Sequence, residues 1–124
     1  MVYPMPQILI ADDSMFQRFV LSKLVKDLGC EPLEASNGQE CLDIGLGSEP
    51  DLIVLDLNMP VRSGLDVLEE LRKAGRTAPT LVVTADIQST TRQRCEDLGA
   101  ARLLNKPVEE QAFREAVLQL LEAR

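Results

Sequence analysis

The sequence has no histidine, no tryptophan and only three cysteines. Without histidine, the chain lacks Ser-His and Cys-His catalytic pairs, histidine metal ligands and any phosphohistidine of its own. Cys30, Cys41 and Cys95 are too few and too scattered for a disulfide framework or a short metal-binding pair. We therefore expect three buried free thiols in a reducing cytosol, and we exclude chemistry that depends on histidine.

Long apolar stretches and excess positive charge are also missing. No run approaches the roughly 20 apolar residues that a membrane helix needs. Residues 1–6 form a short leader that lacks the basic start and the apolar stretch of a signal peptide. The formal net charge of −7 argues against sequence-independent binding to nucleic acid, which depends on lysine and arginine. We therefore expect a soluble cytoplasmic protein with no membrane insertion and no nucleic-acid partner.

The composition does provide enough apolar material for one core. A chain of 124 residues with 45% hydrophobic residues falls in the usual range of a single domain. It shows no linker, internal repeat or low-complexity segment. We therefore expect one domain over residues 1–124.

Apolar runs of strand length alternate with segments of helix length. The runs are Gln7–Ala11, Leu52–Asp56, Thr80–Thr84 and Ala101–Asn105, with a weaker one at Glu31–Ala35. Apolar residues at helical spacing predict the helices between them, for example one that Gly29 ends and a last one that contains Phe113. This alternation predicts an α/β fold whose parallel sheet is covered on both faces.

Polar residues stand at the ends of these predicted strands. They are Asp12, Asp13, Asp56, Thr84 (followed by Ala85) and Lys106. Ligands of open parallel sheets bind at the carboxyl ends of the strands, so we expect these residues to converge. Crowded carboxylates repel one another unless a cation joins them, and few protein ligands together with phosphate oxygens suit Mg²⁺. Lys106 and Thr84 would then bind oxygens of a phosphoryl group.

Each residue also has a simpler interpretation when it is taken alone. Asp13 or Ser14 is able to cap the following helix, because both side chains accept backbone N–H bonds well. A single lysine or threonine at a strand end is often only solvated. Capping does not account for Asp56, Thr84 and Lys106, so the metal-site interpretation depends on all of them converging.

The motifs match a known pattern when they are taken in order. They are Asp12–Asp13, Asp56 within the sequence Leu55–Pro60, Gly64, Thr84–Ala85 and Lys106–Pro107. This set resembles the response-regulator receiver domain, and the resemblance spans nearly the whole chain. It implies a flavodoxin-like, doubly wound fold with a five-stranded parallel sheet of strand order 2-1-3-4-5 and five helices.

The resemblance also implies a role for each site residue. Asp56 would be the phosphoacceptor, which attacks the phosphorus of a kinase phosphohistidine. The implied Mg²⁺ ligands are Asp12 (largely through water), Asp13, Asp56 and the backbone carbonyl of Asn58. The residues that would bind the phosphoryl group and respond to it are Thr84, Ala85 and Lys106. The domain would catalyse only its own phosphorylation and dephosphorylation, so we do not expect an enzyme.

The partners implied are a sensor histidine kinase or a phosphotransfer protein. The chain ends soon after the fifth predicted helix, so we expect the output to pass through helix 4, strand 5 and helix 5. The chemotaxis type is the closest, which implies a diffusible messenger for a flagellar switch or a dedicated phosphatase, as a monomer or a phosphorylation-dependent dimer. A phosphorelay intermediate and a phosphate sink are the alternatives.

Leu103 departs from the family pattern, because many receivers carry an aromatic residue three positions before the strand-five lysine. We therefore predict a two-state switch whose readout depends less on an aromatic ring.

The segment Ile87–Leu98 is the least amphipathic predicted helix, with Ile87, Thr91, Cys95 and Leu98 on one stripe. Its thin apolar stripe suits an element that moves on activation.

Asn58 and Asp86 each lie two positions after a site residue, where water would approach a phosphoaspartate. We hypothesise that both tune the lifetime of the phosphorylated state.

Two other classes of protein are alternatives to a receiver domain. An aspartyl-nucleophile phosphatase of the haloacid dehalogenase type usually carries an acid where this chain has Asn58. A flavin-binding module of the same fold would bring a flavin phosphate against the acids.

Overall fold

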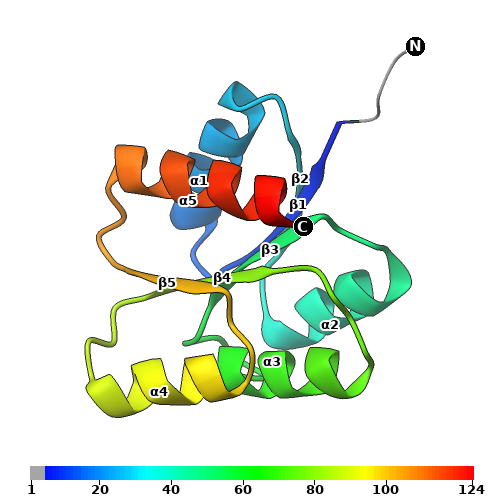
Figure 1. The fold of residues 1–124 in the computed structure, drawn as a ribbon, viewed down its shortest axis with the longest axis vertical. Helices are drawn as coiled ribbons and strands as arrows, with labels where there is room; N and C mark the ends of the chain where they lie inside the picture. The colour runs from blue at the N-terminus through cyan, green and yellow to red at the C-terminus, as the bar shows by residue number, and fades with distance from the viewer. Residues whose placement is uncertain (1–4) are drawn as a thin grey trace.

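The computed structural model describes residues 5–124, so residues 1–4 of the expected leader lie outside the described part of the chain. Strands and helices alternate strictly along the chain (Figure 1). The elements are β1 (Gln7–Ala11), α1 (Met15–Asp27), β2 (Glu31–Ala35), α2 (Gly38–Gly47), β3 (Leu52–Asp56), α3 (Gly64–Lys73), β4 (Thr80–Thr84), α4 (Ser89–Asp97), β5 (Arg102–Asn105) and α5 (Glu110–Ala123).

All strand pairs are parallel, and the sheet has the order β2-β1-β3-β4-β5. The predicted flavodoxin-like fold, with its strand order and five helices, is therefore confirmed. Within residues 5–124, no helix has both the length and the apolar character that crossing a membrane requires.

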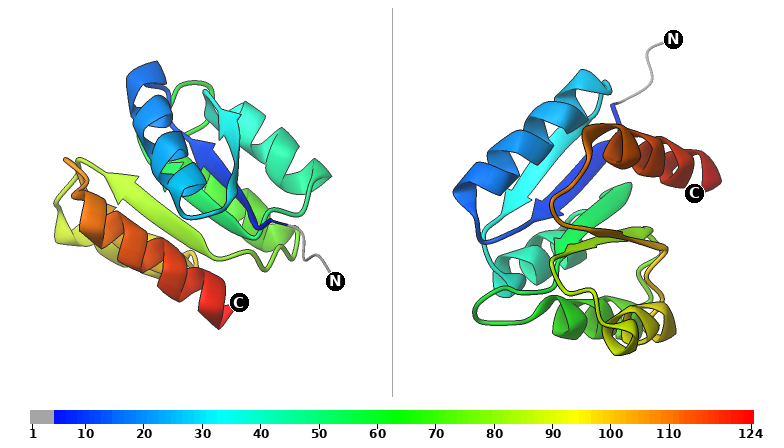
Figure 2. Two further views of the ribbon diagram at one scale, coloured as in Figure 1. Left: turned by 90° about the horizontal axis from the view of Figure 1, so that it is seen from above. Right: turned by 90° about the vertical axis from the view of Figure 1, so that its left-hand side faces the viewer.

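The helices form two layers, with α1 and α5 on one face of the sheet and α2, α3 and α4 on the other (Figures 1 and 2). Successive residues of a strand point to opposite faces. In β1, Ile8 and Ile10 therefore pack with α1 and α5, whereas Leu9 and Ala11 pack with the other layer. Burial on both faces explains why β1, β3 and β4 are nearly continuous apolar runs.

The three cysteines are buried free thiols, as the sequence predicts. Cys30 lies in the core under α1 and α5, while Cys41 and Cys95 lie in the core under α2, α3 and α4. Burial raises the pKa of the Cys41 thiol to about 12, so this group stays protonated at neutral pH. These residues belong to the core.

Two predicted boundaries differ from the structure. Strand β5 begins at Arg102, one residue later than expected. Helix α4 begins at Ser89, and Ile87 lies outside it with 82% of its surface exposed. The Asp86 carboxylate accepts the Gln88 backbone N–H (2.9 Å), which holds residues 86–88 in a turn before the helix. The expected apolar stripe therefore loses Ile87, and Cys95 is the buried residue of α4.

Gly64 brings the start of α3 against the end of β3. Its N–H donates to the Leu57 carbonyl (2.9 Å). A Cβ atom at this position would lie 2.5 Å from the Asp56 carbonyl oxygen and 2.6 Å from Leu57 Cα. Since both of these are backbone atoms, only glycine permits this approach, which fixes the loop that follows Asp56.

Gly64→Ala is expected to lower the free energy of unfolding by about 1–3 kcal/mol, because the added methyl group overlaps backbone. Gly47→Ala is the matched control, since a Cβ at Gly47 of α2 meets no atom within 4 Å. That change should be neutral or stabilise by up to about 1 kcal/mol. Urea unfolding of both variants measures the difference, and equal stabilities would contradict the close approach.

Candidate functional site

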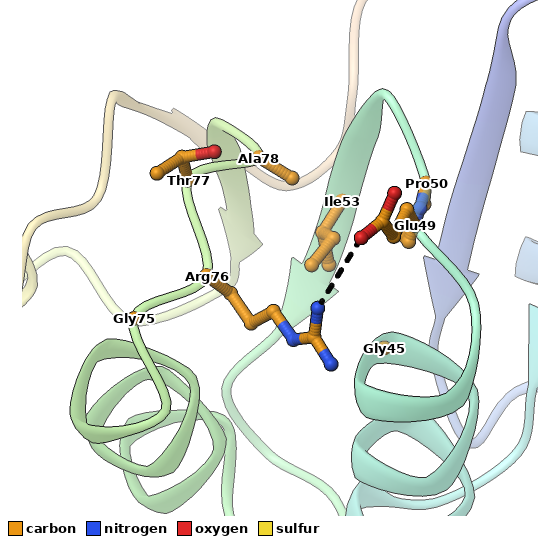
Figure 3. Close-up of a pocket in the computed structure, with 8 residues that line it drawn as sticks. All are labelled: Gly45, Glu49, Pro50, Ile53, Gly75, Arg76, Thr77 and Ala78. Carbon is orange, nitrogen blue, oxygen red and sulfur yellow. Dashed lines mark ion pairs between the residues drawn. The ribbon is translucent and has the colours of Figure 1, made fainter.

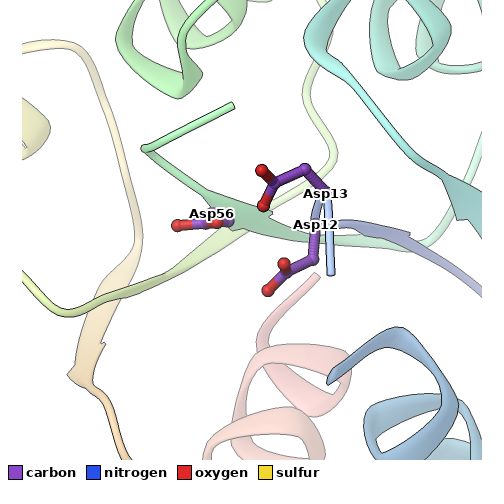
Figure 4. Close-up of side chains that lie close together, drawn as sticks. All are labelled: Asp12, Asp13 and Asp56. Atoms are coloured by element: carbon purple, nitrogen blue, oxygen red, sulfur yellow. The ribbon is translucent and has the colours of Figure 1, made fainter. Parts of the chain in front are cut away.

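Three carboxylates meet at the carboxyl edge of the sheet. Asp12 and Asp13 follow β1, and Asp56 ends β3, which is the neighbouring strand. One carboxylate oxygen from each residue lies within 4.8 Å of the others (Figure 4). Asp12 and Asp56 are only 2% and 4% exposed, whereas Asp13 is exposed. The parallel register of β1 and β3 therefore produces the convergence that the strand ends predict.

Lys106, which follows β5, reaches across β4 to this cluster. Its Nζ lies 3.0 Å from Asp12 Oδ2 and 3.5 Å from Asp56 Oδ2. The Lys106 N–H donates to the Thr84 carbonyl (2.8 Å), which fixes the start of its side chain at the end of β4. One ammonium faces three carboxylates, so two negative charges stay uncompensated when all four groups are ionised.

The environment shifts the pKa values of Asp56 and Lys106. Burial raises the pKa of Asp56, although the Asn58 N–H at 3.2 Å and the charge of Lys106 act in the opposite direction. Burial lowers the pKa of Lys106, but its hydrogen bond to Asp12 and the nearby carboxylate charges outweigh this, and the pKa lies above its ordinary value. Ionising Asp56 in this pocket therefore costs free energy, which a further cation would offset.

Asp12, Asp13 and Ser14, which lie between β1 and α1, make different contacts. Asp12 Oδ1 accepts the Ser14 N–H (2.9 Å), and Ser14 Oγ accepts the Gln17 N–H (3.2 Å). Ser14 is therefore the N-cap of α1, so of the two capping residues that the sequence allowed, Asp13 is not the cap. The carboxylate of Asp13 instead lines the pocket.

A pocket of about 510 Å³ opens above the cluster. Its lining contains the predicted site residues Asp13, Asp56, Asn58, Thr84, Ala85, Asp86 and Lys106. Asp12 lies behind this lining, where it pairs with Lys106. Leu103 does not reach the pocket and instead borders a cavity between α4 and β5. The structure thus brings together every predicted site residue except Leu103.

The donor set suits a hard divalent cation. Asp12, Asp13 and Asp56 offer only oxygen atoms, and their charge exceeds that of Lys106. Mg²⁺ prefers such oxygen ligands, keeps several waters and binds through few carboxylates, which an open pocket permits. The residues present therefore fit Mg²⁺.

Another pocket lies at the opposite edge of the sheet, where β3 and β4 begin (Figure 3). Arg76 lies in it, pairs with Glu49 at 3.7 Å and donates to the Leu46 carbonyl in the last turn of α2. The guanidinium therefore ties the end of α2 to the loop before β4. Its charge is directed to groups of the chain itself, which is the arrangement of a structural contact.

Two site neighbours were missed from the sequence. Arg18 of α1 donates to the Asp12 carbonyl (2.6 Å) and pairs with Glu34 of β2 (3.3 Å). The Asn105 side chain donates to the carbonyls of Thr84 and Asp86. Arg18 gave no signal, since it resembles any solvated helix residue. Asn105 could have been found, because it is a polar residue at a strand end, directly before Lys106.

Comparison with known proteins agrees with this geometry. Residues 8–118 match the family described as the response regulator receiver domain. The chain belongs to this family. Receiver domains are signalling modules of two-component systems that interact with histidine kinases or phosphotransfer proteins and typically bind Mg²⁺ at an acidic pocket.

Individual relatives differ in how much of their length is matched. The transcriptional regulatory protein PdtaR of Mycobacterium tuberculosis is 36% identical over 102 residues, which cover 82% of this chain and 49% of that protein. The chain thus spans about half the length of this relative. Sporulation initiation phosphotransferase F of Bacillus subtilis is 30% identical over 115 residues, or 93% of either chain. The chemotaxis response regulator CheY4 of Vibrio cholerae superposes with a TM-score of 0.88 at 27% identity, covering 94% of this chain and 99% of that one.

Asp56→Asn should stabilise the metal-free protein at pH near 7. The pKa of Asp56 is raised in the folded state, so its contribution to stability is present below the unfolded pKa of about 4 and is lost as pH rises through the folded pKa. Urea unfolding in the presence of a chelator should give the variant a higher free energy of unfolding than wild type near neutral pH. This difference should disappear as the pH falls toward ~4.

Asp43→Asn is the control for this experiment, because it removes the same charge from an exposed position of α2. Its difference from wild type should not follow the same trend. A destabilised Asp56→Asn protein at neutral pH would show that the buried carboxylate is not the costly group.

Proposed function

We propose that the chain is a phosphorylation-activated response regulator in which Asp56 accepts a phosphoryl group from a phosphohistidine of a kinase or phosphotransfer protein. The observation that supports this most is the pocket in which the buried Asp56 lies beside Asp12, Asp13 and Lys106. An acceptor oxygen, a place for a cation and a fixed ammonium are what an in-line phosphoryl transfer requires.

The transfer balances as follows. An Asp56 carboxylate oxygen forms a bond to phosphorus while the P–N bond of the donor breaks, and the imidazole nitrogen keeps the electron pair. Lys106 Nζ already lies 3.5 Å from Asp56, so it is able to bind a phosphoryl oxygen on that residue. The Thr84 hydroxyl and Ala85, which also line the pocket, would bind the others.

Asp13, Asp56 and the backbone carbonyl of Asn58 would hold Mg²⁺, with Asp12 acting largely through water. The ion would neutralise negative charge on the acceptor and the transferred group. Asn58 and Asp86 would tune the lifetime of the phosphoaspartate. The Asp86 carboxylate accepts the Thr91 hydroxyl (2.7 Å) and the Gln88 N–H (2.9 Å), which holds it at the rim of the pocket.

The donor histidine lies outside residues 1–124, because these contain none. Helix α1 begins directly beside the acceptor and presents Met15, Phe16 and Phe19 to solvent, the two phenylalanines at 75% and 67% exposure. Apolar side chains of this size rarely lie together on a surface without a partner. We infer that they contact the phosphohistidine-bearing protein while its imidazole reaches Asp56.

For the output, we propose a chemotaxis-type diffusible messenger in the cytoplasm that signals through α4, β5 and α5. The likeness to CheY4 over nearly the whole chain supports this role. Ile87 before α4 and Leu118 on α5 are exposed and would offer apolar contacts to an output partner. A phosphorelay intermediate or phosphate sink is the alternative, which the match to sporulation initiation phosphotransferase F over 93% of both chains favours.

Incubation with acetyl phosphate and Mg²⁺ should add ~80 Da to the wild-type chain, as one phosphoryl group does. The adduct should be absent from Asp56→Asn, since an amide oxygen does not accept the group. Intact mass spectrometry measures both, with Asp43→Asn as a control that must still be labelled. An unlabelled wild type, or a labelled Asp56→Asn, would refute the proposed acceptor.

The double change Phe16→Ala with Phe19→Ala should slow transfer from a phosphorylated histidine kinase by about tenfold or more, because two exposed anchors are removed. Labelling by acetyl phosphate, which needs no docking surface, should stay at the wild-type rate. Leu46→Ala is the matched control, since Leu46 is exposed at the far end of α2. Equal slowing with both donors would instead indicate damage to the acceptor pocket.

A further inference from the structure

Asn105 connects three parts of the fold through its side-chain amide. It ends β5, one residue before Lys106. Its Nδ2 donates to the Thr84 carbonyl (3.3 Å) and to the Asp86 carbonyl (3.0 Å). Its Oδ1 lies 3.5 Å from the Arg92 guanidinium of α4. One side chain therefore contacts the end of β4, the loop after it and the first turns of α4.

Asp86 extends this connection in both directions. Its backbone N–H donates to the Thr84 hydroxyl (3.1 Å), and its carboxylate accepts the Thr91 hydroxyl of α4 (2.7 Å). The hydroxyl that would bind a phosphoryl oxygen is thus two hydrogen bonds away from α4. We call Asn105, Asp86 and Thr91 the β5–α4 latch.

Helix α4 has few other attachments. Cys95 is its buried residue, and the helix has no side-chain hydrogen bond at its N-cap. Cavities of about 370 Å³ and 290 Å³ lie on its two sides, toward α3 and toward β5. At its far end, the Arg72 guanidinium of α3 donates to the Asp97 carbonyl. The position of its first half therefore depends largely on the latch.

The Asn105 side chain lies on the face of β5 that is turned toward α4. Leu103 and Asn105 are two residues apart, so their side chains point to the same face of the sheet. Leu103 packs in the core that contains Cys95 of α4, whereas the intervening Leu104 packs in the opposite core. Asn105 thus projects toward α4, one step nearer to the acceptor pocket than Leu103.

We propose that Asn105 is the residue that couples the acceptor pocket to α4, a task that the resemblance assigns to an aromatic residue at position 103. This inference rests on the proposed phosphorylation of Asp56. When the Thr84 hydroxyl turns to a phosphoryl oxygen, the Asp86 N–H loses its acceptor and the loop is freed to move. The Thr84 and Asp86 carbonyls then shift relative to Asn105, and α4 shifts with them. Asn105 is a positioning residue, because it touches no reacting atom.

The test is an amide NMR titration of the ¹⁵N-labelled full chain with Mg²⁺ and beryllofluoride, a mimic of the phosphoryl group. In wild type, amides of the pocket (Asn58, Ala85) and of α4 (Arg92, Cys95) should shift together. In Asn105→Asp, the pocket amides should still shift at saturation, while the α4 amides lose most of their response. The aspartate keeps the size of the side chain and an acceptor for Arg92, but it replaces both donors with repulsive oxygens.

Arg102→Gln is the matched control, because Arg102 is also on β5 but its guanidinium binds Gln119 of α5. It should respond as wild type does. Hydrogen exchange without ligand gives a second readout: α4 amides of Asn105→Asp should exchange about tenfold faster or more, while β1 amides stay protected and show that the domain is folded.

The outcomes separate two failures. If wild-type pocket amides do not respond to beryllofluoride, the proposed function is wrong, and the coupling falls with it. If the pocket responds in both proteins and α4 of Asn105→Asp responds as in wild type, the proposed function stands and the role of Asn105 is refuted. Loss of the α4 response in Arg102→Gln as well would also refute it, since any change to β5 would then have the same effect.

Discussion

Like charge is crowded at one edge of the sheet, and the arrangement of the site depends on how that charge is held. Asp12, Asp13 and Asp56 have carboxylate oxygens within 4.8 Å of one another, and two of these side chains are almost fully buried. The Lys106 ammonium reduces the repulsion between the carboxylates by pairing with Asp12 and Asp56. Because one ammonium does not balance three carboxylates, the cluster suits a divalent cation.

The backbone around the cluster follows from the same requirement. Arg18 binds the Asp12 carbonyl, Ser14 caps α1, and Gly64 lets α3 start against the end of β3. Each contact fixes the main chain next to a carboxylate and leaves the carboxylate oxygens free for other partners. The fold thus fixes the main chain around the acids, while the β4–α4 side of the pocket is held largely through the side chains of Asp86 and Asn105.

The sequence was informative where one physical rule governs the outcome. Strands buried on both faces must be continuous apolar runs, so β1, β3 and β4 were predicted with their observed bounds. The weaker run of the edge strand β2, which is only partly buried, was also predicted with its observed bounds. The convergence of the acids followed from parallel pairing alone. Ile87 was misplaced, because an apolar residue at helical spacing does not reveal that a neighbouring Asp86 holds the chain in a turn. The contacts of Arg18 depend on distances between elements, which no local pattern contains. Asn105 was overlooked although it ends a strand, because its partners Thr84 and Asp86 belong to another part of the chain.

The thin attachment of α4 has a consequence for the history of this surface. A helix with one buried side chain imposes little on the choice of its other residues, so substitutions there leave the core and the acid cluster intact. New partners can then be acquired by changing α4 while the acid cluster is inherited without alteration. The thin packing under the helix thus leaves its outer face free to diverge.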